Sequence, residues 1–172
     1  PFLKKLSINL GGTSGVLGGM VQATLFRSVK DSASIAPIFY YESIYGEYVT
    51  EYSRQGANLF AIITNDGWWD DTPGYKQHMA YARLRAIENR KYIVRSANTG
   101  ISAVIDDRGS VLERTEWWED AVISAKVKLN STVTFYAKYG DYIGRIASLL
   151  AGLMIALTVV RTLNKTGKRL SN

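Results

Sequence analysis

Two short segments combine ionisable, amide and aromatic side chains in a way that could perform chemistry. Residues 40–43 read Tyr-Tyr-Glu-Ser and residues 64–69 read Thr-Asn-Asp-Gly-Trp-Trp, and each follows an apolar run. A phenol or a carboxylate held at such a point could serve as a nucleophile or carry a proton. A structural alternative stays open for both segments, because carboxylates also cap helices and aromatic rings also cover sheet edges.

The apolar runs before these segments have the length and composition of buried strands. Residues 36–41 and 59–64 predict two strands, and the spacing of residues 42–55 predicts a helix between them. Catalytic groups of α/β domains gather at the carboxyl ends of strands. Both segments therefore lie where a catalytic site is expected.

Further elements follow the second segment. Residues 75–90 predict a second helix, with charged side chains interleaved among apolar ones. Three β-rich runs come next, at residues 92–96, 102–105 and 121–127. The order β-α-β-α-β-β-β predicts a layered α/β domain. The glycines of the Gly- and Ser-rich residues 1–34 break any helical or strand period, so this stretch predicts a surface loop region. It lacks the GxxxxGK[ST] pattern of a phosphate-binding loop, so phosphate binding is not expected there.

The composition fits one globular unit and excludes several kinds of site. The chain has 172 residues, 47% of them hydrophobic, which is enough for one core and too few for two ordinary domains. It begins at Pro1 with no initiator Met and no leader, so we expect the natural amino terminus to lie upstream. The sequence has no cysteine, and His78 is its single histidine. Disulfides, cysteine-based zinc sites and multi-histidine metal sites are excluded, and no metal or cofactor is expected.

The carboxy-terminal part contains a long uncharged run. Residues 146–160 carry no charge, and the run reaches about 20 residues if the flanking arginines extend their charged ends to the interface. It predicts a membrane-spanning helix, with a buried terminal helix as the alternative. The net charge of +6 is dispersed except for an acid-free tail, which favours a membrane over nucleic acid as partner and predicts a cytoplasmic tail. The tail cations are Arg161, Lys165, Lys168 and Arg169.

Several blocks of the sequence, taken together and in order, resemble one family. Residues 37–43, Pro-Ile-Phe-Tyr-Tyr-Glu-Ser, look like the P-x-I-C-Y-E-S nucleophile segment of the apolipoprotein N-acyltransferases. The resemblance covers roughly residues 30–162 and includes the final apolar run. Its later blocks are residues 64–69, 74–78, 82–88 and 95–102.

The resemblance implies a fold and a location. Members carry a nitrilase-type α-β-β-α sandwich on the periplasmic face of the bacterial cytoplasmic (inner) membrane. This chain would then be the carboxy-terminal portion of such an α/β sandwich followed by one transmembrane helix. The implied parts are a partial carbon-nitrogen hydrolase domain at residues 1–140, a transmembrane helix at 142–162 and a basic cytoplasmic tail at 163–172.

The resemblance also implies a reaction. An acyl chain would pass from a phospholipid donor to the amino terminus of a diacylglyceryl lipoprotein acceptor. In the family a Cys thiolate forms a thioester with the acyl chain, a Glu serves as general base and a Lys stabilises the oxyanion. The segments that hold this Glu and this Lys would precede Pro1, so neither is assigned here.

At the nucleophile position the chain departs from the family, because Tyr40 stands where the family has Cys. A phenol with a pKa near 10 is a poor nucleophile without strong activation, so this chain is expected to be inactive as it stands. Tyr41 and Glu42 do match the family. Glu42 could bind the incoming amine or orient the base, or it could be an ordinary carboxylate at the start of a helix.

Other residues receive roles beside the nucleophile position. The resemblance makes Asn65, Trp68 and Trp69 walls of the pocket for the acyl chain or head group. His78 matches a family position that is not the base, and a structural hydrogen bond is predicted for it. Three cations could attract a phospholipid head group, although ion pairing is the commoner explanation. They are Arg83, Arg85 and Arg95.

Three functions stay open. The first is a fragment of an N-acyltransferase in which Tyr40 reflects loss of function or a sequence error. The second is a catalytically dead, membrane-bound pseudo-enzyme that keeps a surface for lipid or lipoprotein. The third is a soluble carbon-nitrogen hydrolase, for which the terminal helix would have to be part of a core.

Overall fold

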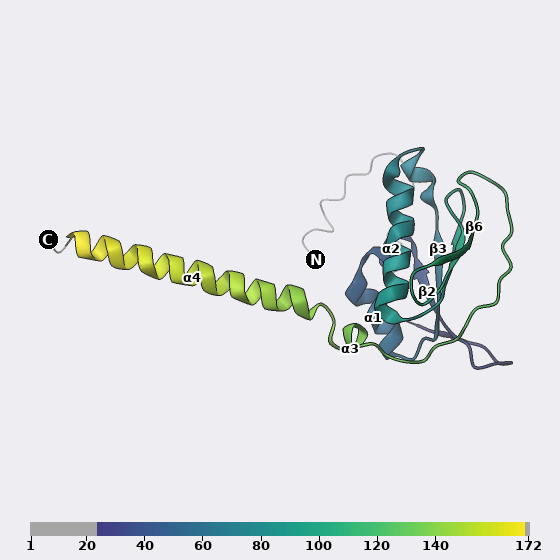
Figure 1. The fold of residues 1–172 in the computed structure, drawn as a ribbon, viewed down its shortest axis with the longest axis horizontal. Helices are drawn as coiled ribbons and strands as arrows, with labels where there is room; N and C mark the ends of the chain where they lie inside the picture. Colours follow the sequence, from purple (N-terminus) through teal and green to yellow (C-terminus); the bar gives the residue numbers. More distant parts are fainter. Residues whose placement is uncertain (1–23, 171–172) are drawn as a thin grey trace, which may run out of the picture.

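A six-stranded mixed sheet forms the centre of the α/β part of the chain (Figure 1). The computed structural model describes residues 24–170, with side chains described as far as residue 163. The strands lie in chain order across the sheet, and only the two pairings among β2, β3 and β4 are parallel. The strands are β1 (Phe26–Arg27), β2 (Ser34–Phe39), β3 (Leu59–Thr64), β4 (Ile93–Ala97), β5 (Ala103–Ile105) and β6 (Val111–Arg114).

Helices fill both parallel crossovers, as βαβ units require. The helix η2 (Tyr40–Ile44) and α1 (Gly46–Arg54) join β2 to β3, while η3 (Asp66–Trp69) and α2 (Pro73–Asn89) join β3 to β4. Thr72 caps α2 by accepting a hydrogen bond from the backbone N–H of Gly74. The proline that follows the cap loses no helical hydrogen bond there.

The core lies between one face of the sheet and the two helices α1 and α2. Side chains alternate between the faces of a strand, so every second residue of β2, β3 and β4 points toward the helices. These side chains pack with apolar residues of both helices. The buried set includes Ala36, Ile38, Phe60, Ile62 and Ile93 from the sheet, and Val49, Tyr52, Met79, Ala82 and Ala86 from the helices.

The opposite face of the sheet is apolar and partly exposed. Phe39, Ile63 and Val94 are exposed by 46%, 48% and 36%. Parallel strands in α/β proteins are normally covered on both faces. Within the part of the chain that the structure describes, helices cover one face of the sheet, and the other face is only partly covered.

The predicted layered α/β domain is present, and its elements differ from the sequence prediction in detail. The strand predicted over residues 36–41 ends at Phe39, because Tyr40 turns into the left-handed region that strands do not use. The helix predicted over residues 42–55 is divided at Tyr45 into η2 and α1. Of the predicted surface loop at residues 1–34, residues 1–23 lie outside the described part, and β1 forms in the rest.

The strand predicted over residues 121–127 does not form. Ile123 and Val127 are half-buried and Val122 is 96% exposed, but the segment pairs with no strand of the sheet, so no ladder of hydrogen bonds forms. The last strand is instead β6, which the sequence prediction missed. It pairs antiparallel with β5 across a tight turn at residues 106–109.

The helices α3 (Phe135–Tyr139) and α4 (Tyr142–Leu170) follow, and α4 projects away from the α/β part (Figure 1). Its segment Tyr142–Leu163 is 22 residues long, apolar enough to cross a membrane and unburied. The alternative of a terminal helix buried in this domain is therefore wrong for the described residues. The base of α4 is tied to α1, because Glu47 binds the Arg145 guanidinium and accepts a hydrogen bond from the Asp141 N–H at 3.0 Å.

Candidate active site

Neighbouring parallel strands bring the two chemically interesting segments together. Their register pairs Phe39, the last residue of β2, with Ile63, one residue before the end of β3. Residues 40–43 and 65–69 therefore start at the same edge of the sheet. Each segment turns at once into a short 3-10 helix, η2 or η3.

Tyr40 occupies a tight elbow between β2 and η2. Its φ is +44°, a left-handed conformation that costs a non-glycine residue about 1 kcal/mol or more. The elbow is held on both sides. The Phe39 N–H donates to Glu42 Oε2 at 2.8 Å, and the Ser43 hydroxyl donates to the Tyr40 carbonyl oxygen at 2.8 Å.

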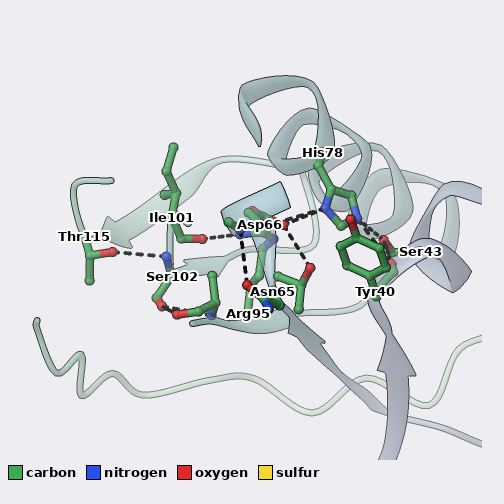
Figure 2. Close-up of polar contacts among 12 residues, drawn as sticks. Tyr40, Ser43, Asn65, Asp66, His78, Arg95, Ile101, Ser102 and Thr115 are labelled. Carbon is green, nitrogen blue, oxygen red and sulfur yellow. Dashed lines mark hydrogen bonds and ion pairs between the residues drawn. The ribbon is translucent and has the colours of Figure 1, made fainter. Parts of the chain in front are cut away.

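A buried chain of polar groups runs from the elbow into the domain (Figure 2). His78 Nε2 lies 2.9 Å from Ser43 Oγ and 3.2 Å from the Tyr40 carbonyl oxygen. On the other side of the ring, His78 Nδ1 lies 2.9 Å from Asp66 Oδ1. Asp66 Oδ2 in turn accepts a hydrogen bond from the Arg95 guanidinium at 2.6 Å. Four elements, η2, α2, η3 and β4, thus meet beneath position 40.

The negative charge of Asp66 orients the polar groups beside it. Burial alone would raise the pKa of its carboxyl, but the hydrogen bond from His78 and the positive charge of Arg95 outweigh burial and lower the pKa to about 2. A carboxylate only accepts hydrogen bonds, so His78 Nδ1 is the donor toward Asp66. The ring is thereby oriented with Nε2 facing the elbow.

A small apolar pocket of about 260 Å³ lies beside Tyr40. It is smaller than the pockets that usually hold whole ligands, which run from about 300 to 1,000 Å³. A short apolar group would fit in it beside side chain 40. The lining residues are Phe39, Tyr40, Ile63, Thr64, Asn65 and Trp68.

The Tyr40 phenol is poorly suited to nucleophilic attack. Burial raises its pKa above the ordinary value for a phenol, and the hydrogen bond with Tyr41 raises it further. The two rings lie edge to face, with their centroids 4.4 Å apart. The reactive phenolate is therefore even scarcer at neutral pH than in free tyrosine.

Ser43, His78 and Asp66 have the order of contacts of a Ser-His-Asp triad, but Ser43 cannot reach a substrate as it stands. Its side chain lies beneath the elbow, and the residue is only 1% exposed. Its hydroxyl also contacts the carbonyl of Tyr40. In a working triad the nucleophile is accessible to the carbon it attacks. The three residues therefore belong to the framework of the site.

The structure brings only some of the predicted pocket residues together, and it gives Glu42 a structural contact. Asn65 and Trp68 line the pocket beside Tyr40. Trp69 is not among the lining residues; it packs against the core and lies edge-on to Tyr41 at 6.0 Å. Glu42 accepts hydrogen bonds from the Phe39 N–H and, at 3.1 Å, from the Tyr48 hydroxyl, so it caps the elbow. Its role toward an amine stays a prediction.

Ion pairs and backbone contacts hold the three predicted head-group cations. Arg85 pairs with Glu88 at 3.2 Å, and Arg95 pairs with Asp66. Because Arg85 and Arg95 are buried, the ion-pair explanation holds for both. Arg83 is exposed and donates to the carbonyl of Gly109 at 2.8 Å.

The structural hydrogen bond predicted for His78 is present, but its partners were missed by the sequence. Asp66 and Arg95 are 29 residues apart, and no local spacing indicates that they meet. Gly100 packs against this pair, because a Cβ added there would collide with the Asp66 side chain. Within residues 24–170, no three His, Cys, Asp or Glu side chains gather so as to hold a metal ion.

Sequence comparison finds a family model and similar proteins. Residues 18–136 match the carbon-nitrogen hydrolase model. The chain is 35% identical over 163 residues to the apolipoprotein N-acyltransferase of Chlorobaculum tepidum and 34% identical over 161 residues to that of Geobacter metallireducens. Each match covers 94% of this chain but only 31% and 30% of the respective relatives. The chain thus spans less than a third of the length of these proteins.

Structural comparison agrees on the fold. A carbon-nitrogen hydrolase from Helicobacter pylori superposes with a TM-score of 0.53 and 12% identity, over 60% of this chain and 43% of that one. At this identity the likeness concerns the fold alone. The family model, in contrast, matches well over half of the sequence. The chain therefore belongs to the carbon-nitrogen hydrolase family.

Proposed function

We propose that the chain is the carboxy-terminal part of an apolipoprotein N-acyltransferase in which residue 40 does not serve as nucleophile. Such an enzyme moves an acyl chain from phospholipid to the amino terminus of a diacylglyceryl lipoprotein. The position of Tyr40 carries the proposal. It occupies the strained elbow at the end of β2, beside an apolar pocket, in the segment that resembles the nucleophile block of the family.

Two features support the lack of activity in the chain as it stands. The pKa of the Tyr40 phenol is raised, so the group that would attack is protonated. The buried Lys91 cannot stabilise an oxyanion at this site, because it precedes β4 and so lies at the opposite end of the sheet. The family's Glu and Lys would come from other segments of a complete enzyme.

The same proposal includes a membrane location. The segment Tyr142–Leu163 has the length and composition of a span. The tail beyond it is basic, and basic segments favour the cytoplasmic side. The α/β domain would then face the periplasm from the bacterial inner membrane. Lipid donor and lipoprotein acceptor would reach it from the outer surface of that membrane.

A chimera tests the proposal. The chain would replace the matching carboxy-terminal part of the Geobacter metallireducens relative, once with Tyr40 and once with Tyr40→Cys. Mass spectrometry of a reporter lipopeptide in membranes would measure N-acylation. We expect the Cys chimera to acylate and the Tyr chimera to lose at least 100-fold in rate, as expected when a nucleophile is removed.

The controls separate the possible failures. Both chimeras must reach the membrane in equal amounts, which immunoblotting checks. If the folded Cys chimera shows no acylation, the proposed acyltransferase function is wrong. If both chimeras acylate equally, Tyr40 does not abolish activity and that part of the proposal fails.

A catalytically dead, membrane-bound lipid-binding or lipoprotein-binding protein is the second candidate. The hydrogen-bonded polar residues beneath Tyr40 and the pocket beside it favour this candidate, because a ligand site would keep both without chemistry. In vesicles, a phospholipid with a photoreactive acyl chain should label residues 39–68, and Ile63→Lys should reduce that labelling. Leu84→Lys, on the outer face of α2, is the control. Labelling confined to α4 would contradict this candidate.

A further inference from the structure

The elbow at Tyr40 needs anchors, because a non-glycine residue keeps a left-handed conformation only when its surroundings hold it. Glu42 binds the peptide group before the elbow, at the Phe39 N–H. Ser43 and His78 contact the peptide group after it, at the Tyr40 carbonyl. Glu42 and Ser43 are sequence neighbours of the elbow, whereas His78 comes from α2, 38 residues away. His78 therefore ties the elbow to the core of the domain.

The His78 ring is itself held firmly. Its Nδ1 donates to Asp66, and Asp66 is fixed by Arg95 and by the Thr64 hydroxyl, which donates to Oδ1 at 2.9 Å. The side chains that form this series of hydrogen bonds are buried. Hydrogen bonds in such a low-dielectric setting strongly restrict orientation. Nε2 has little freedom to face anything but Ser43 and the carbonyl of residue 40.

We infer that His78 is a positioning residue for this site. With a proton on both ring nitrogens, it donates from Nδ1 to Asp66 and from Nε2 toward the carbonyl of residue 40, which Ser43 also binds. It thereby fixes the direction in which side chain 40 meets the pocket. His78 acts through residue 40 and makes no contact with the pocket itself, whose lining excludes it. That residue 40 occupies the nucleophile position rests on the proposed function, but the anchoring of its carbonyl by His78 does not.

The sequence offers a direct probe of the anchored group. Tyr40 and Tyr41 form the one Tyr-Tyr pair of the chain. Labelling tyrosine with carbonyl ¹³C and amide ¹⁵N therefore gives a single carbonyl-to-amide NMR correlation, from the Tyr40 carbonyl to the Tyr41 nitrogen. The carbonyl ¹³C shift moves upfield when a hydrogen bond to that carbonyl is lost. The spectra would be recorded on the full chain in detergent micelles.

Two substitutions of His78 separate its two contacts. In His78→Gln the side-chain amide reaches the place of Nε2, and in His78→Asn it reaches the place of Nδ1. We expect the Tyr40 carbonyl signal to shift upfield or split in His78→Asn and in Ser43→Ala, and to stay near its original position in His78→Gln. Ser53→Ala is the matched control, since it removes a buried hydrogen bond of 2.8 Å to Asn89 far from the elbow.

The outcomes decide the inference. If His78→Asn leaves the signal in place, or if Ser53→Ala shifts it equally, His78 does not position residue 40. If a His78 variant fails to fold, Ser43→Ala tests the shared anchor alone, and an unchanged signal there overturns the inference as well. No acyl transfer is measured, so failure of the proposed function would leave this result unaffected.

Discussion

At the scale of single residues, Gly100 shows how closely the polar chain beneath the elbow is packed. A Cβ at this position would lie 2.3 Å from Asp66 Oδ2 and 2.7 Å from Asp66 Cβ. Asp66 cannot move aside easily, because its two oxygens hold His78 and Arg95. The absence of a side chain at residue 100 is therefore part of the site.

Gly100→Ala should destabilise the domain by about 1–3 kcal/mol, the usual effect of overpacking a filled interior. Urea unfolding in micelles, followed by tryptophan fluorescence, would measure the free energy of unfolding. Gly152→Ala is the control, because nothing lies within 4 Å of a Cβ there. Equal stability of the two variants would show that Asp66 is less rigidly held than the contacts indicate.

Lys91 is a buried lysine outside the site, and it makes stability depend on pH. Its ammonium donates to the Thr132 carbonyl, and burial lowers its pKa from 10.5 to about 8. Between these two values the unfolded chain binds more protons than the folded chain, so stability rises with pH. Below pH 8 both states are protonated, and the full cost of burying the charge is present.

Lys91→Met should raise stability at pH 7 by about 1–3 kcal/mol, because it removes the cost of the buried charge and keeps the volume. It should also flatten the rise in stability between pH 8 and 10.5. Urea midpoints across this range would test both effects, with exposed Lys126→Met as control. A variant that is less stable than the parent at pH 7 would mean that the bond to Thr132 outweighs desolvation.

At the scale of elements, the sequence predicted what local pattern controls. The strand expected over residues 59–64 is β3 without change, and the helix expected over 75–90 is α2 within two residues. A continuous apolar run defines the first, and a cap followed by proline starts the second. The two segments of the candidate site were also predicted, because each directly follows a strand that the apolar runs predict.

The rest depended on contacts between distant residues. The elbow at Tyr40 exists because Ser43 and His78 hold it, and one of these comes from α2. The same holds for β6, which forms because β5 offers it an edge. Apolar alternation at residues 121–127 looked equally strand-like, yet that segment pairs with no strand. Pattern alone does not distinguish a run with a partner from one without.

The short helix α3 links the domain to α4, and one threonine secures it. Thr134 Oγ1 accepts a hydrogen bond from the Ala137 N–H at 3.0 Å and donates to the Glu88 carbonyl at 2.5 Å. Thr134→Val keeps the shape and removes both bonds, at an expected cost of about 1–2 kcal/mol. Hydrogen exchange at residues 135–139 should become faster. The same acceleration in Thr132→Val, whose side chain is exposed, would argue against the cap.

At the scale of the whole molecule, two apolar surfaces need cover. One is α4, which a bilayer or micelle would surround. The other is the outer face of the sheet, where Phe39, Ile63 and Val94 are exposed. Because α4 extends away from the sheet, detergent that surrounds this helix need not cover the sheet face (Figure 1). The two surfaces should therefore behave independently.

In micelles the chain should self-associate through the sheet face even though α4 is covered, because exposed apolar patches drive association. Val94→Lys places a charge on this face and should shift the protein toward monomer, whereas Leu84→Lys on the outer face of α2 should not. Light scattering coupled to size-exclusion chromatography would measure the protein mass in each micelle. A parent chain that is monomeric at every concentration would show that the sheet face is already covered, by detergent or by residues outside the described part. Association that persists unchanged in Val94→Lys would place the contact elsewhere, with α4 as the next surface to test.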